Sequence, residues 1–139
     1  MTASFNDGVQ AMTVELYYLI WSAALTLALS MLSMVGASQQ VGGATLAGNR
    51  EGMPEITGWA GRCIRAHRNM VENIGIFAIL VLTAKVAGIS NAMTVLGAQL
   101  FFFARVGFAI AYILGVPYLR SVIYVVSVTG MVLIFLQLV

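Results

Sequence analysis

Charged residues are scarce in this chain, making up 9% of its 139 residues against about 25% in soluble domains. Cys63 is the only cysteine, so no intramolecular disulfide can form. The sequence also lacks zinc-binding spacings, a P-loop and a dinucleotide-binding glycine motif after a strand, so we predict no metal site. A net charge of +2 is too small to indicate nucleic acid as a partner. These absences argue against most soluble classes of protein.

Long apolar stretches are what the chain has instead, and 60% of its residues are hydrophobic. Four stretches approach the 20 or so helical residues that cross a bilayer, at about 16–35, 70–87, 92–114 and 119–139. We therefore predict an all-α integral membrane protein, a four-transmembrane-helix bundle in one domain, 1–139. The stretch through Met12 has no Lys or Arg, so we expect no cleavable signal peptide and a retained first span.

The basic residues are unevenly distributed between the connections. Lys85 lies alone on one side, whereas the connections after the first and third spans contain or adjoin Arg50, Arg62, Arg65, Arg68 and Arg120. The positive-inside rule places those two connections in the cytoplasm and both termini outside. The longest connection, about 36–61, contains several glycines and Pro54, and we predict a cytoplasmic loop that folds over the bundle.

Polar residues gather at the start of the second span. Arg65, Asn69 and Glu72 occur at i, i+4 and i+7 and so share one helix face, which suits a wet cavity better than lipid. A short turn at 88–91 makes the second and third spans antiparallel neighbours, and a symmetric hairpin puts Arg105 level with Glu72. We predict an ion pair between them, which either serves only packing or also contributes to a site.

The start of the fourth span forms a second polar group. Pro117 suits the beginning of a helix, and Arg120 and Ser121 follow in its first turn. A helix N-terminus that carries these side chains is a candidate anion site. Tyr112 lies seven residues after Arg105 on the same face of the third span, so its hydroxyl is expected to point into the same cavity.

Three motifs occur in order on the second, third and fourth spans. They are Arg65-Ala-His-Arg-Asn69-x-x-Glu72, then Arg105-Val-x-x-x-x-Ala-Tyr112, then Pro117-x-x-Arg120-Ser121-x-x-Tyr124. Together they resemble the MAPEG family, the membrane-associated proteins of eicosanoid and glutathione metabolism. The amino-acid sequence of the connection from Gly48 to Arg62 resembles that of the bacterial members.

The resemblance implies a homotrimer of four-helix subunits in a bacterial inner membrane, with glutathione as co-substrate bound between subunits. It implies a transferase or peroxidase of detoxification, acting on lipophilic electrophiles or lipid hydroperoxides. Arg120 and Ser121 are the implied catalytic residues, placed at the glutathione sulfur. The implied glutathione-binding residues are Arg65, Arg68, Asn69, Glu72, Arg105, Tyr112 and Tyr124.

Two other functional classes stay open. A small transporter would use a membrane-embedded carboxylate such as Glu72 for proton coupling. A catalytically silent subunit would keep the fold and stabilise a partner. Cys63 also has two interpretations, because neighbouring Arg62 and Arg65 favour a reactive thiolate, whereas a plain interfacial cysteine, which we favour, needs no special role.

Overall fold

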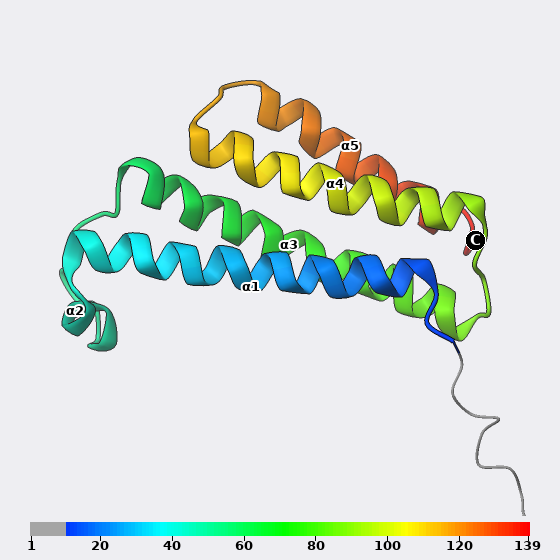
Figure 1. The fold of residues 1–139 in the computed structure, drawn as a ribbon, viewed down its shortest axis with the longest axis horizontal. Helices are drawn as coiled ribbons and strands as arrows, with labels where there is room; N and C mark the ends of the chain where they lie inside the picture. Colours follow the sequence, from blue (N-terminus) through cyan, green and yellow to red (C-terminus); the bar gives the residue numbers. More distant parts are fainter. Residues whose placement is uncertain (1–10) are drawn as a thin grey trace, which may run out of the picture.

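The computed structural model describes residues 11–139, and within that range the chain is helical without strands (Figure 1). Its helices are α1 (Val14–Val41), α2 (Gly43–Ala47), α3 (Gly58–Val86), α4 (Ala92–Leu114) and α5 (Leu119–Phe135). Three of them, α1, α3 and α4, are long and apolar enough to cross a membrane, and α5 is an apolar helix of 17 residues. The chain is a membrane protein. The expectation about a signal peptide concerns a stretch that lies mainly outside the described residues.

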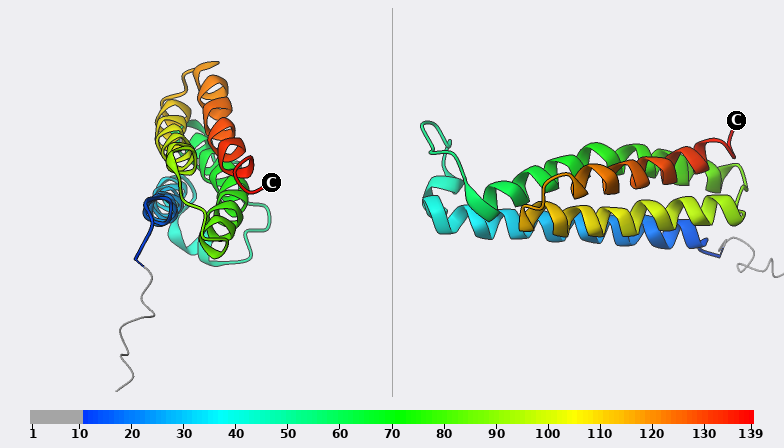
Figure 2. Two further views of the ribbon diagram at one scale, coloured as in Figure 1. Left: turned by 90° about the vertical axis from the view of Figure 1, so that its right-hand side faces the viewer. Right: turned by 90° about the horizontal axis from the view of Figure 1, so that it is seen from above.

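The long helices form two hairpins that lie side by side (Figures 1 and 2). The most extensive packing is between α4 and α5 and between α1 and α3, and contacts between α3 and α5 are sparse. One end of the bundle holds the α3–α4 turn. The other holds α2 and the α4–α5 turn, and there α1 extends beyond that turn.

The first helix is longer than the sequence indicated. The predicted loop over 36–61 is wrong in its first part, because α1 continues to Val41 and the short α2 follows. Gly36 lies inside α1, where a Cβ atom would approach the Cβ of Ala60 to 2.6 Å, so this glycine permits close packing of α1 on α3. The helix ends instead at Gly42, whose φ of 81° favours glycine.

The other predicted spans agree with the helices more closely. α3 begins at Gly58, which confirms that the polar pattern from Arg62 onward is helical, and α4 has the predicted bounds. α5 begins at Leu119 as predicted but ends at Phe135.

Two close contacts join α4 to its neighbours. The rings of Phe77 and Phe101 stack with centroids 4.0 Å apart and join α3 to α4. A Cβ atom at Gly97 would lie 2.5 Å from the carbonyl oxygen of Gly130, and the converse approach is equally close. Small residues at such crossings let membrane helices pack backbone to backbone.

A polar cluster ties α1 to the start of α4 at the α3–α4 end. Asn91 caps α4, accepting from the backbone N–H groups of Met93 and Thr94. The carboxylate of Glu15 is buried and accepts from the hydroxyls of Thr94 and Ser90. A buried carboxylate is tolerated here because hydroxyl donors replace the water that it loses.

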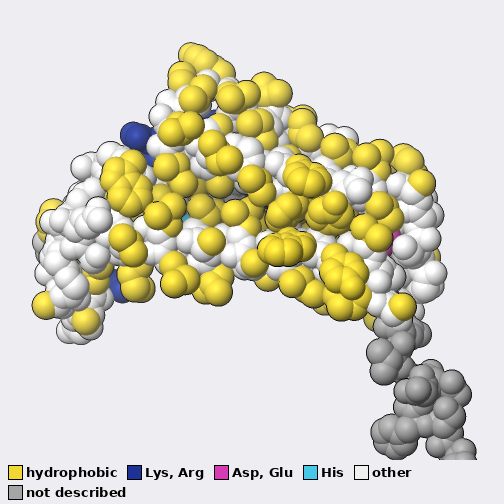
Figure 3. Space-filling model, viewed as in Figure 1, with side chains coloured by type: hydrophobic (Ala, Val, Ile, Leu, Met, Phe, Trp, Pro, Cys, Tyr) yellow, Lys and Arg dark blue, Asp and Glu magenta, His cyan; other side chains and the backbone are white. Residues whose placement is uncertain are grey.

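Apolar side chains cover most of the face shown in Figure 3. The Lys and Arg side chains visible there gather toward the end that holds α2. Exposed apolar side chains of the helices, such as Leu27, Met31, Ile79 and Phe103, are suited to lipid rather than water.

Candidate functional site

The α4–α5 turn sets the position of the first turn of α5. Gly115 ends α4 in the left-handed region, and Tyr118, with a φ of 63°, is a non-glycine residue with a positive φ. No side chain caps the start of α5 at Tyr118. Arg120 and Ser121 therefore lie in the first turn of a helix whose N-terminal dipole favours negative charge.

A cavity of about 340 Å³ opens beside that turn. We call it the Arg120 cavity, and it is lined by Asn69 of α3, Phe108 and Tyr112 of α4, and Arg120, Ser121, Tyr124 and Val125 of α5. The guanidinium of Arg120 lies over the ring of Tyr112, 4.8 Å from its centroid. Such cation–π packing holds the arginine at the cavity without neutralising its charge.

Arg105 lies next to this cavity and is 1% exposed. Its Nη1 donates to Oδ1 of Asn69 at 2.6 Å, whereas its Nε and Nη2 have no hydrogen-bond partner among the described residues. Its guanidinium is surrounded by the rings of Phe101, Phe108 and Tyr124, whose centroids lie 5.3–5.5 Å from the Cζ atom of Arg105. A buried guanidinium with unpaired donors is costly, so this arrangement suits an anionic or strongly accepting group.

The structure brings most of the predicted site residues together. Five of them line the Arg120 cavity, namely Asn69, Tyr112, Arg120, Ser121 and Tyr124, and Arg105 contacts two of these five. Arg65, Arg68 and Glu72 are exposed and lie outside the cavity in the single chain. Arg68 lines a different cavity, toward α1.

The predicted ion pair between Glu72 and Arg105 is wrong within the chain. Arg105 instead donates to Asn69, which lies one turn before Glu72 on α3, and the side chain of Glu72 is exposed. A symmetric hairpin puts Arg105 at the right depth to within about one turn of α3, but it does not fix the rotation of α3 about its axis. Its buried stripe contains Met70, Asn73 and Phe77, and Glu72 points about 100° away from Asn73.

The sequence did not predict the structural roles of two residues in this region, Asn73 and Arg62. Asn73 is buried, donates to the backbone oxygen of Asn69 at 2.8 Å, and lines an apolar groove between α3 and α5 that also reaches Tyr124. Its spacing of four from Asn69 was the available signal. Arg62 donates from Nε to the carbonyl oxygen of Ile113 at 2.8 Å, which ties α3 to the end of α4. No sequence pattern indicated that bond.

Cys63 is fully buried between α1 and α3. The hydroxyl of Ser33 donates to its sulfur at 3.3 Å. A thiol without solvent access is a poor nucleophile, which favours the plain structural interpretation. Among the residues the structure describes, no group of His, Cys, Asp and Glu side chains is arranged to hold a metal ion.

The sequence profile of the MAPEG family matches residues 16–139, which is nearly the whole chain. No curated protein and no solved structure matches it.

Proposed function

The chain belongs to the MAPEG family, and from that premise we propose that it binds glutathione in the Arg120 cavity and stabilises the thiolate. The main supporting observation is that Arg120 and Ser121, on the first turn of α5, line a cavity next to the buried guanidinium of Arg105. Glutathione is an anionic tripeptide with carboxylate and amide oxygens. Arg120 and Ser121 line the cavity and can donate to such oxygens directly, whereas the guanidinium of Arg105 lies buried beside the cavity and adds positive charge there.

The energy required for thiolate formation is modest. A thiol with a pKa of about 8.5 is only about 3% ionised at pH 7, and lowering that pKa by two units takes about 2.7 kcal/mol of preferential stabilisation. A charge-assisted hydrogen bond is worth about 1.5–3 kcal/mol. A helix N-terminus adds about 0.3–1 kcal/mol. Arg120 and the start of α5 together therefore supply energy of the right order.

The proposed reactions follow from a stabilised sulfur nucleophile. In conjugation, the glutathione sulfur forms a bond to carbon of a lipophilic electrophile, whose displaced leaving group departs with the electron pair. In peroxide reduction, two glutathione molecules are oxidised to the disulfide while a lipid hydroperoxide becomes an alcohol and water. The apolar groove between α3 and α5, which shares Tyr124 with the Arg120 cavity, supports entry of the lipophilic substrate from the bilayer.

Assembly and orientation are part of the same proposal. We place α5 across the membrane as a fourth span, the α2 end in the cytoplasm of a bacterial inner membrane, and three chains in a homotrimer. In the proposed trimer glutathione lies between neighbouring subunits. The exposure of Arg65, Arg68 and Glu72 supports their role as ligand contacts at such an interface, since a single chain leaves them at its surface.

The test is the ultraviolet absorbance of glutathione thiolate on adding glutathione to the purified protein. We expect a thiolate signal at pH 7 that Arg120→Leu largely removes, together with about a ten- to twenty-five-fold loss of conjugation rate, because the thiolate fraction falls as the pKa returns toward about 8.5. Lys85→Leu, which removes a cation at the opposite end, should keep the signal. Wild-type signal and turnover in Arg120→Leu would refute the mechanism.

Two further measurements separate the roles of the lining residues. Asn69→Leu should mainly weaken glutathione affinity, and Ser121→Ala should show whether the hydroxyl shares in thiolate stabilisation. Absence of any bound thiolate in the wild-type protein would leave the transporter and the silent subunit as the remaining readings. The exposure of Glu72, outside the Arg120 cavity, gives the transporter no supporting observation.

A further inference from the structure

A side chain near the start of α3 holds the α4–α5 turn. Half-buried Arg62 donates from Nε to the carbonyl oxygen of Ile113 at 2.8 Å. Ile113 is the next-to-last residue of α4, where carbonyl oxygens lack a partner within the helix. Among the described residues, no other hydrogen bond joins residues 113–121 to the α1–α3 hairpin. This bond therefore fixes the turn relative to α3.

The guanidinium of Arg62 also packs against the turn itself. Gly115 ends α4 with a φ of 76°, and the three atoms nearest to a Cβ built on it all belong to Arg62, at 3.2–3.5 Å. A side chain at this position would be strained and would crowd the arginine. A cation that caps the last carbonyl oxygens of a helix also interacts favourably with the helix dipole. The glycine and the arginine thus fit together as one contact.

The segment that carries Arg62 is itself well anchored. The side chain of Gln40, near the end of α1, accepts from the backbone N–H of Thr57 and donates to its carbonyl oxygen, both at 3.0 Å. Thr57 is the N-cap residue of α3. A Cβ atom at Gly61 would clash with the carbonyl oxygen of Ile56, so the chain is tightly packed there. Arg62 therefore reaches the turn from a fixed base.

A short turn transmits this position to Arg120. Three residues, 116–118, separate Gly115 from the start of α5. The ring of Pro117 fixes one backbone angle, and Tyr118 has a φ of 63°, which a residue with a side chain keeps only where its surroundings hold it. Displacement of the turn would therefore move Arg120 relative to the α3 wall of its cavity.

We propose that Arg62 is a positioning residue for the Arg120 cavity. It holds the α4–α5 turn against the start of α3, and this hold sets where the first turn of α5 presents Arg120 and Ser121 to a bound anion. Arg62 does not line the cavity, so it acts through the turn. Its effect on a glutathione thiolate rests on the proposed function, whereas its hold on the turn does not.

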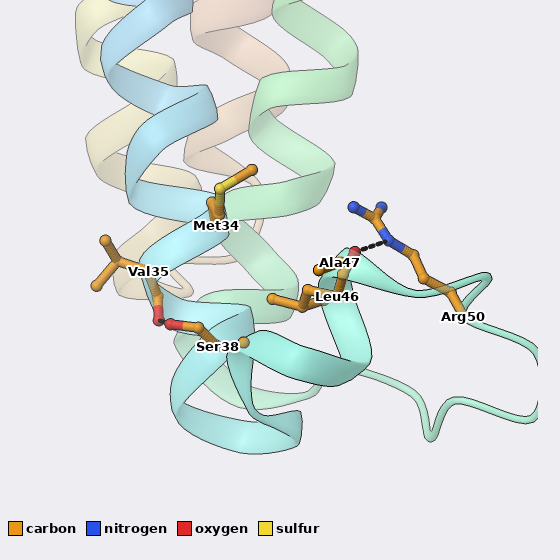
Figure 4. Close-up of a pocket in the computed structure, with 7 residues that line it drawn as sticks. Met34, Val35, Ser38, Leu46, Ala47 and Arg50 are labelled. Carbon is orange, nitrogen blue, oxygen red and sulfur yellow. Dashed lines mark hydrogen bonds between the residues drawn. The ribbon is translucent and has the colours of Figure 1, made fainter.

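Two substitutions separate the hydrogen bond of Arg62 from its charge. In glutamine, Nε2 occupies the same place along the side chain as Nε of arginine, so Arg62→Gln keeps a donor for Ile113 and removes the charge. Arg62→Met keeps an unbranched side chain and removes the donor. Arg50→Met is the matched control. Exposed Arg50, at a positive φ of 62°, donates from Nε to the carbonyl oxygen of Leu46, also at 2.8 Å but away from the α4–α5 turn (Figure 4).

Amide hydrogen exchange of the purified protein without glutathione tests the hold on the turn. The backbone N–H groups of Gly115, Val116 and Ser121 all donate to nearby backbone oxygens. We expect their exchange to be about ten-fold faster in Arg62→Met, and changed less than two-fold in Arg62→Gln and Arg50→Met. Arg62→Leu also lacks the donor and replaces Arg62→Met if thermal unfolding shows that the latter does not fold. Unchanged exchange in the variant without a donor would overturn the proposal.

The absorbance of bound glutathione thiolate tests the consequence at the cavity. Arg62→Met should lower the thiolate fraction at pH 7 about five-fold and change glutathione affinity less than two-fold, because Arg62 is not a lining residue. Arg62→Gln should keep at least half of the signal.

Equal loss of thiolate in Arg62→Gln and Arg62→Met would assign the effect to charge and overturn the positioning role. A faster-exchanging turn with a full thiolate signal would overturn it as well. A wild-type protein without bound thiolate would instead refute the proposed function, and the exchange result would still decide whether Arg62 holds the turn.

Discussion

Arg105 and Asn69 are joined by a hydrogen bond of 2.6 Å from Nη1 to Oδ1, and this bond connects α4 to α3 beside the Arg120 cavity. It is the one side-chain hydrogen bond that the buried guanidinium makes within the described chain. An interhelical bond to a charged donor matters more when water is excluded, because neither partner has an alternative.

Replacing Asn69 with Leu should therefore destabilise the protein by about 1.5–3 kcal/mol, since the arginine would lose its partner. Arg105→Met should be destabilising as well, and the double variant should cost less than the sum of the two single changes. The free energy of unfolding in one fixed detergent measures all three. Glu72→Leu is the control and should change stability by less than about 0.5 kcal/mol, because its side chain is exposed. Additive effects of Asn69→Leu and Arg105→Met would contradict the coupling.

Thr94→Val tests the buried carboxylate of Glu15 at the opposite end. The valine is nearly isosteric, but it removes the hydroxyl that donates to Glu15 and accepts from the N-cap backbone. We expect a loss of about 1–3 kcal/mol in the free energy of unfolding. Thr129→Val is the matched control, because that hydroxyl is exposed and bonds only the carbonyl oxygen of Val125 in its own helix. An equal loss in the free energy of unfolding in both variants would show that the hydrogen bond to Glu15 contributes no more to stability than the bond to Val125.

Gly97→Ala and Gly130→Ala should each separate α4 from α5. The added methyl group would lie 2.5 Å from a backbone oxygen, so the helices must move apart, at about 1–3 kcal/mol. Gly75→Ala is the comparison in α3, where a Cβ atom meets nothing within 4 Å, and it should leave stability unchanged or raised by up to about 1 kcal/mol. Thermal unfolding ranks the three variants, and a Gly97→Ala protein as stable as Gly75→Ala would refute the close contact.

Cysteine labelling tests the proposed orientation. The native Cys63 is fully buried and should react little with a thiol reagent, so labelling of a Gly43→Cys variant in intact cells reports on the introduced cysteine. An impermeant maleimide should leave Cys at this position unlabelled until the membrane is opened, because α2 is proposed to face the cytoplasm. Labelling from outside would reverse the orientation and place the Arg120 cavity on the other side.

The sequence predicted most of the helical bounds because hydropathy reports directly on burial in lipid. It also predicted that Tyr112 points into the same cavity as Arg105, since their spacing of seven fixes one face of the third span. That Arg120 and Ser121 share a site with Tyr112 was implied only by the resemblance to the MAPEG family, because spacing cannot relate residues on different helices. The partner of Arg105 required the rotation of α3 about its axis, which spacing alone leaves undetermined. The sequence predicts a loop at Gly36, because it cannot distinguish a glycine needed for close packing of two helices from one needed for a turn. Arg50 owes its place to a left-handed backbone, for which an arginine gives no signal.

The buried Glu15 cluster gives the bundle a fixed point at one end. It joins α1 to α4 there, while the Arg120 cavity lies near the other end and draws its walls from both hairpins. α4 has 23 residues and is about 34 Å long, so each degree of tilt about the fixed end shifts the far end by about 0.6 Å. The Glu15 cluster therefore opposes tilting of α4 against α1, and it adds to the contacts that limit how far Asn69 and Arg120 can separate.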